Sequence, residues 1–403
     1  MQRVEWMDGL RGLAAMQVLL LHYVSAFLPA IGLMQPELAH YGWEKYFIKT
    51  PLFMPLDGFS AVYLFFVLSG VALTYSFNSR PLALTAGVVR RAVRLGVPMA
   101  VALVLAGVLL ALFPEARGTV AKMTGSEGWL GAAAPLPVNV GGIAHQIAFE
   151  GMLTGFSDTS FWPSWVVRFI DLVPFEDTYL SPIWTLHVEF VGSILILILV
   201  SLRSLAGPKI HCIVCIVFLV FFTASALVLF VVGHLAAAWL PRLPTSRLMT
   251  ATGISLLLGG IILCTSGQSD LGMALLKFLP PAPIGVTVGS INIVRMLGSI
   301  LVFSGIAITP PLQRGLKQPA IKWLGKISFG LYLTHFALLI TAVSCLFTVI
   351  SHLLPYGIAV ATTTIVGISL SCWIAGVFEK WVDRPAIELS RRLSRLSARA
   401  LSS

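Results

Sequence analysis

The sequence predicts an all-α membrane protein with about ten transmembrane helices and cytoplasmic N- and C-termini. Of its 403 residues, 57% are hydrophobic and only 11% are charged. The mean hydropathy of +0.90 lies far above that of soluble globular domains. The excess of 27 Lys and Arg over 17 Asp and Glu is gathered in short segments between apolar runs. This pattern indicates orientation in a lipid bilayer and argues against nucleic-acid binding.

Most of the apolar runs have the length of one transmembrane helix, which must cross about 30 Å of hydrocarbon. Residues 210–240 are the exception, being too long for one ordinary span and short for two, with residues 223–225 as the only turn. The first run is not followed by a signal-peptide cleavage site, so we expect it to be retained. The single-span runs are 10–29, 59–77, 92–113, 183–203, 248–266, 284–308, 326–347 and 356–378.

The positive charges decide how residues 210–240 cross the membrane. Lys and Arg in short loops mark the cytoplasmic side. If this run forms two short, tilted helices, every basic cluster falls inside; if it forms one helix, the last three clusters fall outside. We therefore predict two helices. The clusters lie at residues 90–94, 203–209, 242–247, 314–326 and 384–399.

The chain is predicted to form one membrane domain, residues 1–385, followed by a basic cytoplasmic tail, residues 386–403. Residues 114–182 form a long external segment rich in acidic residues. Its weakly apolar part, residues 140–156, is expected to be a re-entrant or surface helix, because one more full span would reverse the orientation downstream. Such loops often carry function.

The cysteines and most histidines are expected to be structural. All five cysteines lie in apolar runs, which excludes a secreted disulfide framework, and we predict no metal site. Cys212 and Cys215 form a CxxC pair that we attribute to packing. The histidines without matching partners are His40, His145, His211, His234 and His352.

The first span carries two polar residues on one face. Arg11 and His22 are eleven residues apart, which at about 100° per residue is three turns plus roughly 20°, with about 16 Å of rise. Arg11 is thus expected near the cytoplasmic boundary and His22 near the middle of the membrane. Polar groups in a span are costly unless they face protein or water, so the pair indicates a functional site. The alternative is that Arg11 snorkels to the surface and His22 bonds a backbone carbonyl.

Two neighbouring segments fit a site that binds a phosphate-bearing ligand. Ser69 and Gly70, midway along the second span, allow a helix or a ligand to approach closely. Arg90, Arg91 and Arg94 open the third span on the cytoplasmic side, and guanidinium groups bind phosphate well. Helix packing and membrane orientation explain these residues equally well.

The fourth and ninth spans supply candidate groups for acid–base chemistry. Trp184 and Glu189 lie in the first two turns of the fourth span, where an unpaired carboxylate is costly and a partner is expected. Tyr332 and His335 lie in the ninth span, with His335 at a depth comparable to that of His22. Two histidines and a carboxylate suffice for general acid and base work.

The motifs that carry these residues also occur together in a known family. The chain resembles acyltransferase family 3, the bacterial membrane O-acyltransferases, over residues 6–385. The resemblance implies a multi-pass protein of the bacterial inner membrane that transfers an acetyl or other short acyl group from cytoplasmic acyl-CoA to a hydroxyl of a cell-surface glycan or glycolipid. The matching stretches, in order, are "MDGLRGLAAMQVLLLH", "FFVLSG", "RRAVRLGVP", "IWTLHVEF" and "WLGKISFGLYLTH".

The resemblance also implies roles for particular residues. His22 matches the essential catalytic histidine of the family, and Arg11 matches the arginine paired with it. Arg91 and Arg94 match an arginine pair that contacts the acyl donor, and Arg90 lies beside them. The "FFVLSG" stretch, which contains Ser69 and Gly70, matches as written.

The remaining candidates surround the expected reaction centre. Glu189 and His335 are expected to orient His22 or to bind the acceptor. Tyr332 and Ser69 are expected to donate hydrogen bonds to the thioester oxygen, and Trp184 to bind substrate. His22 would act either as a general base or by forming an acyl-histidine, and the sequence does not separate the two mechanisms.

The main departure from the family pattern is Thr185, which stands where a serine is usual. Because the sequence ends in a basic tail, we expect no fused external hydrolase-like domain, and any acyl relay on the outer side would be a separate protein. The alternative from another class is a proton-coupled secondary transporter or exporter, in which the buried His, Arg and Glu would relay protons. The inverted repeats typical of transporters are not found in the sequence.

Overall fold

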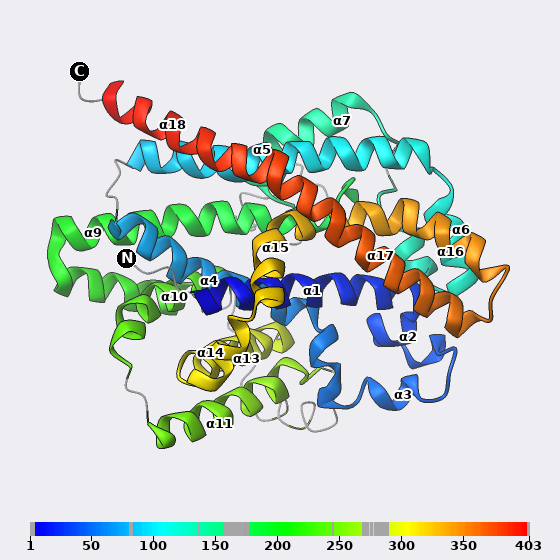
Figure 1. The fold of residues 1–403 in the computed structure, drawn as a ribbon. Helices are drawn as coiled ribbons and strands as arrows, with labels where there is room; N and C mark the ends of the chain where they lie inside the picture. The colour runs from blue at the N-terminus through cyan, green and yellow to red at the C-terminus, as the bar shows by residue number, and fades with distance from the viewer. Residues whose placement is uncertain are drawn as a thin grey trace.

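The computed structural model describes residues 5–79, 84–135, 137–156, 174, 177–223, 225–243, 246–267, 274, 277 and 290–400. Its described secondary structure is entirely helical. Most of the long helices run in a similar direction across the bundle, with α1 near its middle (Figure 1). The N- and C-termini lie toward one end of the bundle, on the left of this view. The predicted all-α class is therefore confirmed.

Within the described residues, the bundle contains ten long helices and several short ones. The long helices are α1 (Glu5–Phe27), α4 (Gly58–Ser79), α5 (Leu84–Leu112), α9 (Trp184–Phe221), α10 (Leu227–Trp239), α11 (Arg247–Cys264), α13 (Ser290–Ala307), α15 (Pro319–Leu338), α17 (Tyr356–Phe378) and α18 (Arg384–Ala400). The short α-helices are α2 (Pro29–Gly32), α3 (Glu44–Phe47), α6 (Ala116–Thr124), α7 (Val140–His145), α14 (Pro310–Leu316) and α16 (Ser344–Ser351). The 3₁₀- and π-helical segments are η1 (Pro36–Leu38), η2 (Pro51–Leu56), η3 (Glu127–Gly131), η4 (Gln146–Thr154), η6 (Ser181–Ile183), η7 (Leu240–Arg242), η8 (Leu339–Val343) and η9 (Glu379–Asp383).

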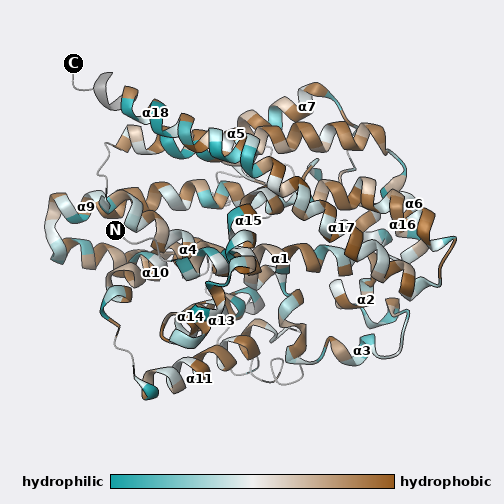
Figure 2. Cartoon of the chain, viewed as in Figure 1, coloured by the Kyte–Doolittle hydropathy of each residue, from teal (hydrophilic) through white to brown (hydrophobic). Residues whose placement is uncertain are grey.

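The apolar helices make this a multi-pass membrane protein. Within the described residues, seven helices are long and apolar enough to cross a membrane, or eight if α13 and α14, which bend by 95° at their break, form one span. Apolar residues cover most of the helix surfaces (Figure 2). The count of about ten spans and the cytoplasmic position of the termini stay predictions. Part of the predicted span at residues 284–308 lies outside the described residues.

Residues 210–240 form two helices, as the charges predict, but neither is long enough to span. The chain breaks at Gly207, whose φ of 80° and ψ of 174° are not helical, and Pro208 follows. Residues 208–221 and α10 are each about 20 Å long at about 1.5 Å per residue, short of the hydrocarbon thickness. We call residues 208–223 and 225–239 the re-entrant hairpin. A hairpin that enters and leaves on one side preserves the downstream orientation just as two full spans would.

The external segment also dips into the bundle, where α7 and η4 run antiparallel to α5. Ile143 contacts Gly107 near the end of α5, and Met152 contacts Gly96 more than two turns earlier. The Met152 carbonyl oxygen then lies 2.7 Å from His187 Nδ1 on α9. Of the two expectations for residues 140–156, this packing favours the re-entrant helix. Residues 157–173 and 175–176 lie outside the described part of the segment.

The basic C-terminal segment is a helix joined to the bundle, and the predicted boundary at residue 385 falls inside it. α17 continues through η9 into α18, which packs along α5 (Figure 1). Ala386, Ser390 and Ser394 are buried in this contact, while hydrophilic residues mark the rest of the helix (Figure 2). The segment is therefore a packed amphipathic helix and not a separate extension.

Candidate active site

Two cavities lie one after the other along α1. The first, the histidine cavity, has a volume of about 670 Å³ and is lined by His22, Trp129, Trp184 and Phe336 among others. The second, the arginine cavity, has a volume of about 510 Å³. Its polar lining includes Asp8, Arg11, Ser69, Arg91, Arg94, Glu189, Lys326, Ser328, Glu379, Asp383 and Arg384. Both cavities share Val62 and Tyr332 in their walls, so these two residues separate the two spaces.

Close packing of α1 against α15 brings His22 to His335. A methyl group at Gly12 would lie 2.5 Å from the Gly325 backbone nitrogen, and one at Gly325 would lie 2.1 Å from the Asp8 carbonyl oxygen. Glycine at both positions therefore lets the two backbones touch. At the far end of this contact, His22 Nδ1 lies 2.8 Å from His335 Nε2, although the residues are 313 positions apart in the chain.

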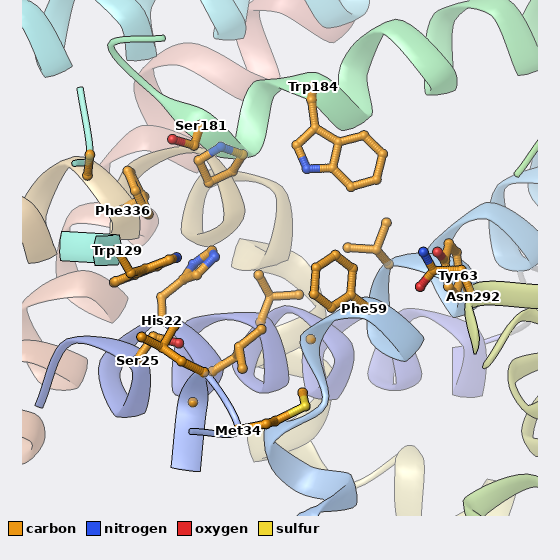
Figure 3. A pocket seen from close by; sticks show the side chains of 18 of the residues that line it. His22, Ser25, Met34, Phe59, Tyr63, Trp129, Ser181, Trp184, Asn292 and Phe336 are labelled. Carbon is orange, nitrogen blue, oxygen red and sulfur yellow. The ribbon is translucent and has the colours of Figure 1, made fainter. Parts of the chain in front are cut away.

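The hydrogen bonds of this pair assign its protons. His335 Nδ1 lies 2.8 Å from the carbonyl oxygen of Leu331, and a carbonyl can only accept. His335 therefore donates from Nδ1, and its Nε2 atom, when the ring is neutral, is an acceptor for the Nδ1 proton of His22. The Nε2 atom of His22 is left with its lone pair, and the ring reaches into the histidine cavity (Figure 3). This is the tautomer that a general base needs.

Aromatic side chains hold the His22 ring in place. The Trp129 ring stacks on it with centroids 5.7 Å apart, and the Phe336 ring meets it edge-on at 5.1 Å. Trp129 comes from the external segment and Phe336 from α15, next to His335. Figure 3 shows both rings around His22, with Ser181 and Trp184 across the cavity. The imidazole is thus held between fixed rings and opens onto a largely apolar space.

The Tyr332 side chain, which lies between the two cavities, is hydrogen-bonded to residues at the start of α9. Its hydroxyl donates to the Pro182 carbonyl oxygen at 3.1 Å and lies 3.0 Å from Thr185 Oγ1. Thr185, which replaces the usual serine, keeps the hydroxyl that makes this contact. Tyr332 is therefore a tethered wall residue whose hydroxyl has partners within the protein.

The arginine cavity is lined by ion pairs. Arg91 Nη2 lies 2.8 Å from Glu189 Oε1, and Arg94 pairs with Asp383 at the start of the C-terminal helix. The Arg94 guanidinium also lies 5.0 Å from the centre of the Phe329 ring. Arg384 Nε lies 2.6 Å from Glu379 Oε1. The lining holds five basic and four acidic side chains, so its charge is nearly balanced.

The structure divides most of the predicted site residues between the two cavities. His22, Trp184 and Tyr332 line the histidine cavity, and Arg11, Ser69, Arg91, Arg94 and Glu189 line the arginine cavity. Three expectations need correction. Glu189 contacts Arg91 and not His22, Arg90 lies outside the lining of both cavities, and Gly70 packs against α10, where a methyl group would lie 2.3 Å from the Phe230 carbonyl oxygen.

Sequence reasoning missed three features, two in this site and one away from it. Trp129 stacks on His22 from a loop that has no periodic pattern. Asp383 directly precedes a basic cluster, although a carboxylate just after a span is itself a signal of pairing. The third feature is the contact of His211, Cys215 and His234, whose only sequence signal is the spacing of four between His211 and Cys215.

A comparison with protein families identifies the family of the chain. A family model described as an acyltransferase domain matches residues 4–375, nearly the whole chain. No curated protein and no solved structure shows significant similarity to it. The matched range includes His22, Arg94, Glu189 and His335, whereas Asp383 lies beyond it. The chain belongs to acyltransferase family 3.

Proposed function

We propose that the chain is an O-acyltransferase of the bacterial cytoplasmic membrane that moves an acetyl or other short acyl group from acyl-CoA to a hydroxyl of a cell-surface glycan or glycolipid. Family membership supports acyl transfer. The observation that carries the finer proposal is the His22 Nε2 lone pair, which faces one cavity while an arginine-lined cavity adjoins it behind Tyr332. Such an arrangement suits two substrates that approach from opposite sides.

The arginine cavity is the proposed donor site. A guanidinium has five N–H groups, and each of Arg91 and Arg94 uses only part of this set on its carboxylate partner. The Nε atom of Arg91 is buried with no hydrogen-bond partner among the described residues, which leaves a donor for a ligand. Phosphate oxygens of acyl-CoA would bind here. The acyl arm would then pass Val62 and Tyr332 to reach His22.

In the proposed reaction, His22 is the general base. Its Nε2 atom takes the proton of the acceptor hydroxyl as the hydroxyl oxygen bonds to the thioester carbonyl carbon. The carbon–sulfur bond then breaks, and the proton on His22 passes to the departing CoA sulfur. Throughout the reaction, His335 Nε2 accepts a hydrogen bond from His22 Nδ1–H and so stabilises the imidazolium. General base catalysis of this kind contributes about 10²- to 10⁴-fold.

An acyl-histidine route uses the same atoms in two steps. His22 Nε2 would attack the thioester carbon directly and release CoA, and the acceptor hydroxyl would then take the acyl group from the ring nitrogen. Both routes need the same tautomer. The two routes differ in one respect: only the acyl-histidine route transfers the acyl label to the enzyme when no acceptor is present.

The histidine cavity is the proposed acceptor site. Its wall combines aromatic rings, among them Trp129, Trp184 and Phe59, with a few polar groups such as Ser181 and Asn292 (Figure 3). Ligand sites are commonly apolar with a small number of orienting polar groups. Its volume of about 670 Å³ is large enough for a sugar-sized group. A separate periplasmic protein would serve as any further acyl relay.

The test is turnover of radiolabelled acetyl-CoA by the detergent-solubilised protein. We expect His22→Gln to lower the rate of acetyl-CoA hydrolysis or transfer by about 10²- to 10⁴-fold and to leave acetyl-CoA affinity within a few-fold. His352→Gln is the matched control, because His352 is exposed and lies outside both cavities. Acid-quenched mass spectrometry without an acceptor detects an acyl-histidine at His22 only in the two-step route. Full turnover by His22→Gln would overturn the proposal.

A further inference from the structure

Three metal-ligating side chains meet in the re-entrant hairpin, away from both cavities. His211 and Cys215 lie on the first arm, four residues apart and so on one face of the helix. His234 lies on the second arm, α10. His211 Nε2 is 2.9 Å from His234 Nε2, and Cys215 Sγ is 3.5 Å from His211 Nε2. All three side chains are buried, with 7%, 1% and 3% of their surface exposed.

A hydrogen-bond chain from α4 fixes the tautomer of His234. The Thr74 hydroxyl donates to the Gly70 carbonyl oxygen at 2.7 Å, so its oxygen accepts from His234 Nδ1 at 2.8 Å. His234 therefore carries its proton on Nδ1, and its Nε2 lone pair faces His211 and Cys215. Metal-binding histidines are held in this way, with the other ring nitrogen donating to an outer oxygen.

The ligand atoms lie close enough together for one small metal ion to bind all three after small side-chain shifts. Zinc binds histidine nitrogen at about 2.0–2.1 Å and cysteine sulfur at about 2.3 Å, so two ligands of one ion lie well under about 4.5 Å apart. The ligand atoms of the three side chains all lie within 4.8 Å of one another, and His211 Nε2 lies closer than this to both His234 Nε2 and Cys215 Sγ. Thiolate and imidazole together select zinc or copper(I) over magnesium or calcium.

We propose that His211, Cys215 and His234 bind one borderline-soft transition-metal ion, Zn²⁺ or Cu⁺, which ties the two arms of the re-entrant hairpin together. The competing explanation is a direct bond in which His211 Nε2–H donates to His234 Nε2. In that case the Cys215 thiol stays protonated and has no role as a ligand. The two explanations therefore differ in whether Cys215 is a thiolate bound to a metal.

The surrounding charge bears on which ion binds. Arg203 acts electrostatically on all three ligands. Its positive charge repels a doubly charged ion more than a singly charged one. The site holds one negative charge once Cys215 ionises. The experiment therefore tests Zn²⁺ and Cu⁺ separately.

The metal would set the position of the hairpin tip in the histidine cavity. Ser225, Ala226 and Leu227, at the turn between the arms, line the same cavity as His22 and Trp184. A metal ion bound by both His211 and His234 would hold the two arms of the hairpin together and would therefore fix the position of the turn that joins them. A bound ion would thus be structural, and its first effect would be on stability rather than on acyl transfer.

The experiment uses the full-length protein in detergent, stripped of metal by a chelator and then titrated with Co²⁺ as a probe for zinc. We expect one Co²⁺ per chain with a thiolate-to-cobalt charge-transfer absorption, displaced by Zn²⁺, and a higher unfolding temperature with Zn²⁺ than without. A parallel titration with Cu⁺ against a chromogenic chelator identifies a copper site if Cu⁺ binds at one per chain and Co²⁺ does not. Wild-type protein that binds neither ion overturns the proposal without the need for any variant.

Variants then assign the ligands. We expect Cys215→Ser to remove the charge-transfer absorption and His234→Gln to weaken binding at least as much. Cys212→Ser is the matched control, since Cys212 is on the same helix but exposed, and it should leave the spectrum unchanged. Thr74→Val removes only the outer oxygen and should weaken affinity by about 10- to 100-fold. Binding that is unchanged in Cys215→Ser or lost in Cys212→Ser would contradict the assignment.

Discussion

His22 and His335 form a relay that ends on a backbone carbonyl and contains no carboxylate. The Leu331 carbonyl oxygen accepts from His335 Nδ1 at 2.8 Å, and His335 Nε2 accepts from His22 Nδ1 at 2.8 Å. A carbonyl is neutral, so it orients the two rings without adding a full charge to an apolar interior, where an unpaired charge is costly. His335 is fully buried and lies outside the lining of both cavities, so we assign it as a positioning residue for His22.

Removing the acceptor on His335 should weaken catalysis through His22. In His335→Leu, the Nδ1 proton of His22 loses its partner, which costs about 1–3 kcal/mol for a buried donor, or about 5- to 150-fold in kcat. His335→Gln keeps an acceptor oxygen and should recover part of the rate. The measurement is kcat and KM for acetyl-CoA, with His352→Leu as control.

KM separates this role from simple misfolding. A positioning role lowers kcat and leaves KM for acetyl-CoA near the wild-type value, because the donor site lies in the other cavity. An equal loss of kcat in His335→Leu and His335→Gln would show that the hydrogen bond between the two histidines does not contribute to catalysis.

At the scale of helices, small residues decide which faces meet. α4 and α10 touch through Gly70 and Gly233, where a methyl group would lie 2.3 Å from the Phe230 carbonyl oxygen and 2.2 Å from the Val67 carbonyl oxygen. The same principle joins α1 to α15 through Gly12 and Gly325. These contacts set the register that brings His22 to His335 and Thr74 to His234.

Alanine at the α4–α10 contact should destabilise the fold. Gly70→Ala and Gly233→Ala each force the two helices apart, which costs about 1–3 kcal/mol for overpacking and lowers the unfolding temperature in detergent. Gly259→Ala in α11 is the control, because no atom lies within 4 Å of its added methyl group. That change should be neutral or stabilising by up to about 1 kcal/mol, since alanine favours helix. Gly70→Ala as stable as Gly259→Ala would refute the packing argument.

At the scale of the molecule, the arginine cavity, the N-terminus and α18 belong to the same side of the bundle. Asp383 and Arg384, at the start of α18, line the arginine cavity together with Asp8 and Arg11 of α1. Figure 1 shows both termini at one end and α2 and α3 at the other. Acyl-CoA is a cytoplasmic donor, so the proposed function requires the end that carries the termini to face the cytoplasm.

The orientation can be measured on intact cells with a membrane-impermeant maleimide. We expect a cysteine in place of Tyr46, whose surface is 76% exposed on α3, to react from outside. A cysteine in place of Arg392, exposed on α18, should react only after the membrane is permeabilised. The parent protein measures background from the native cysteines. External labelling at position 392 would overturn both the predicted orientation and the direction proposed for the donor.

The sequence by itself determined the all-α membrane class, the family motifs and the shared face of Arg11 and His22. Each of these follows from local properties of the chain, namely hydropathy over the width of a bilayer and the period of one helix. The positive charges also predicted that residues 210–240 enter and leave the membrane on the same side, although length alone did not tell a full crossing from the re-entrant hairpin.

Only the tertiary structure decided which buried groups are partners. Glu189 and His335 were both expected to orient His22 or to bind the acceptor, but only His335 lies beside His22, and Glu189 contacts Arg91. His211, Cys215 and His234 had no sequence pattern that joined both arms of the hairpin, yet their ligand atoms converge. Contacts between helices depend on the crossing and register that glycines such as Gly12, Gly70 and Gly325 permit. The period of a single helix carries no information about that register.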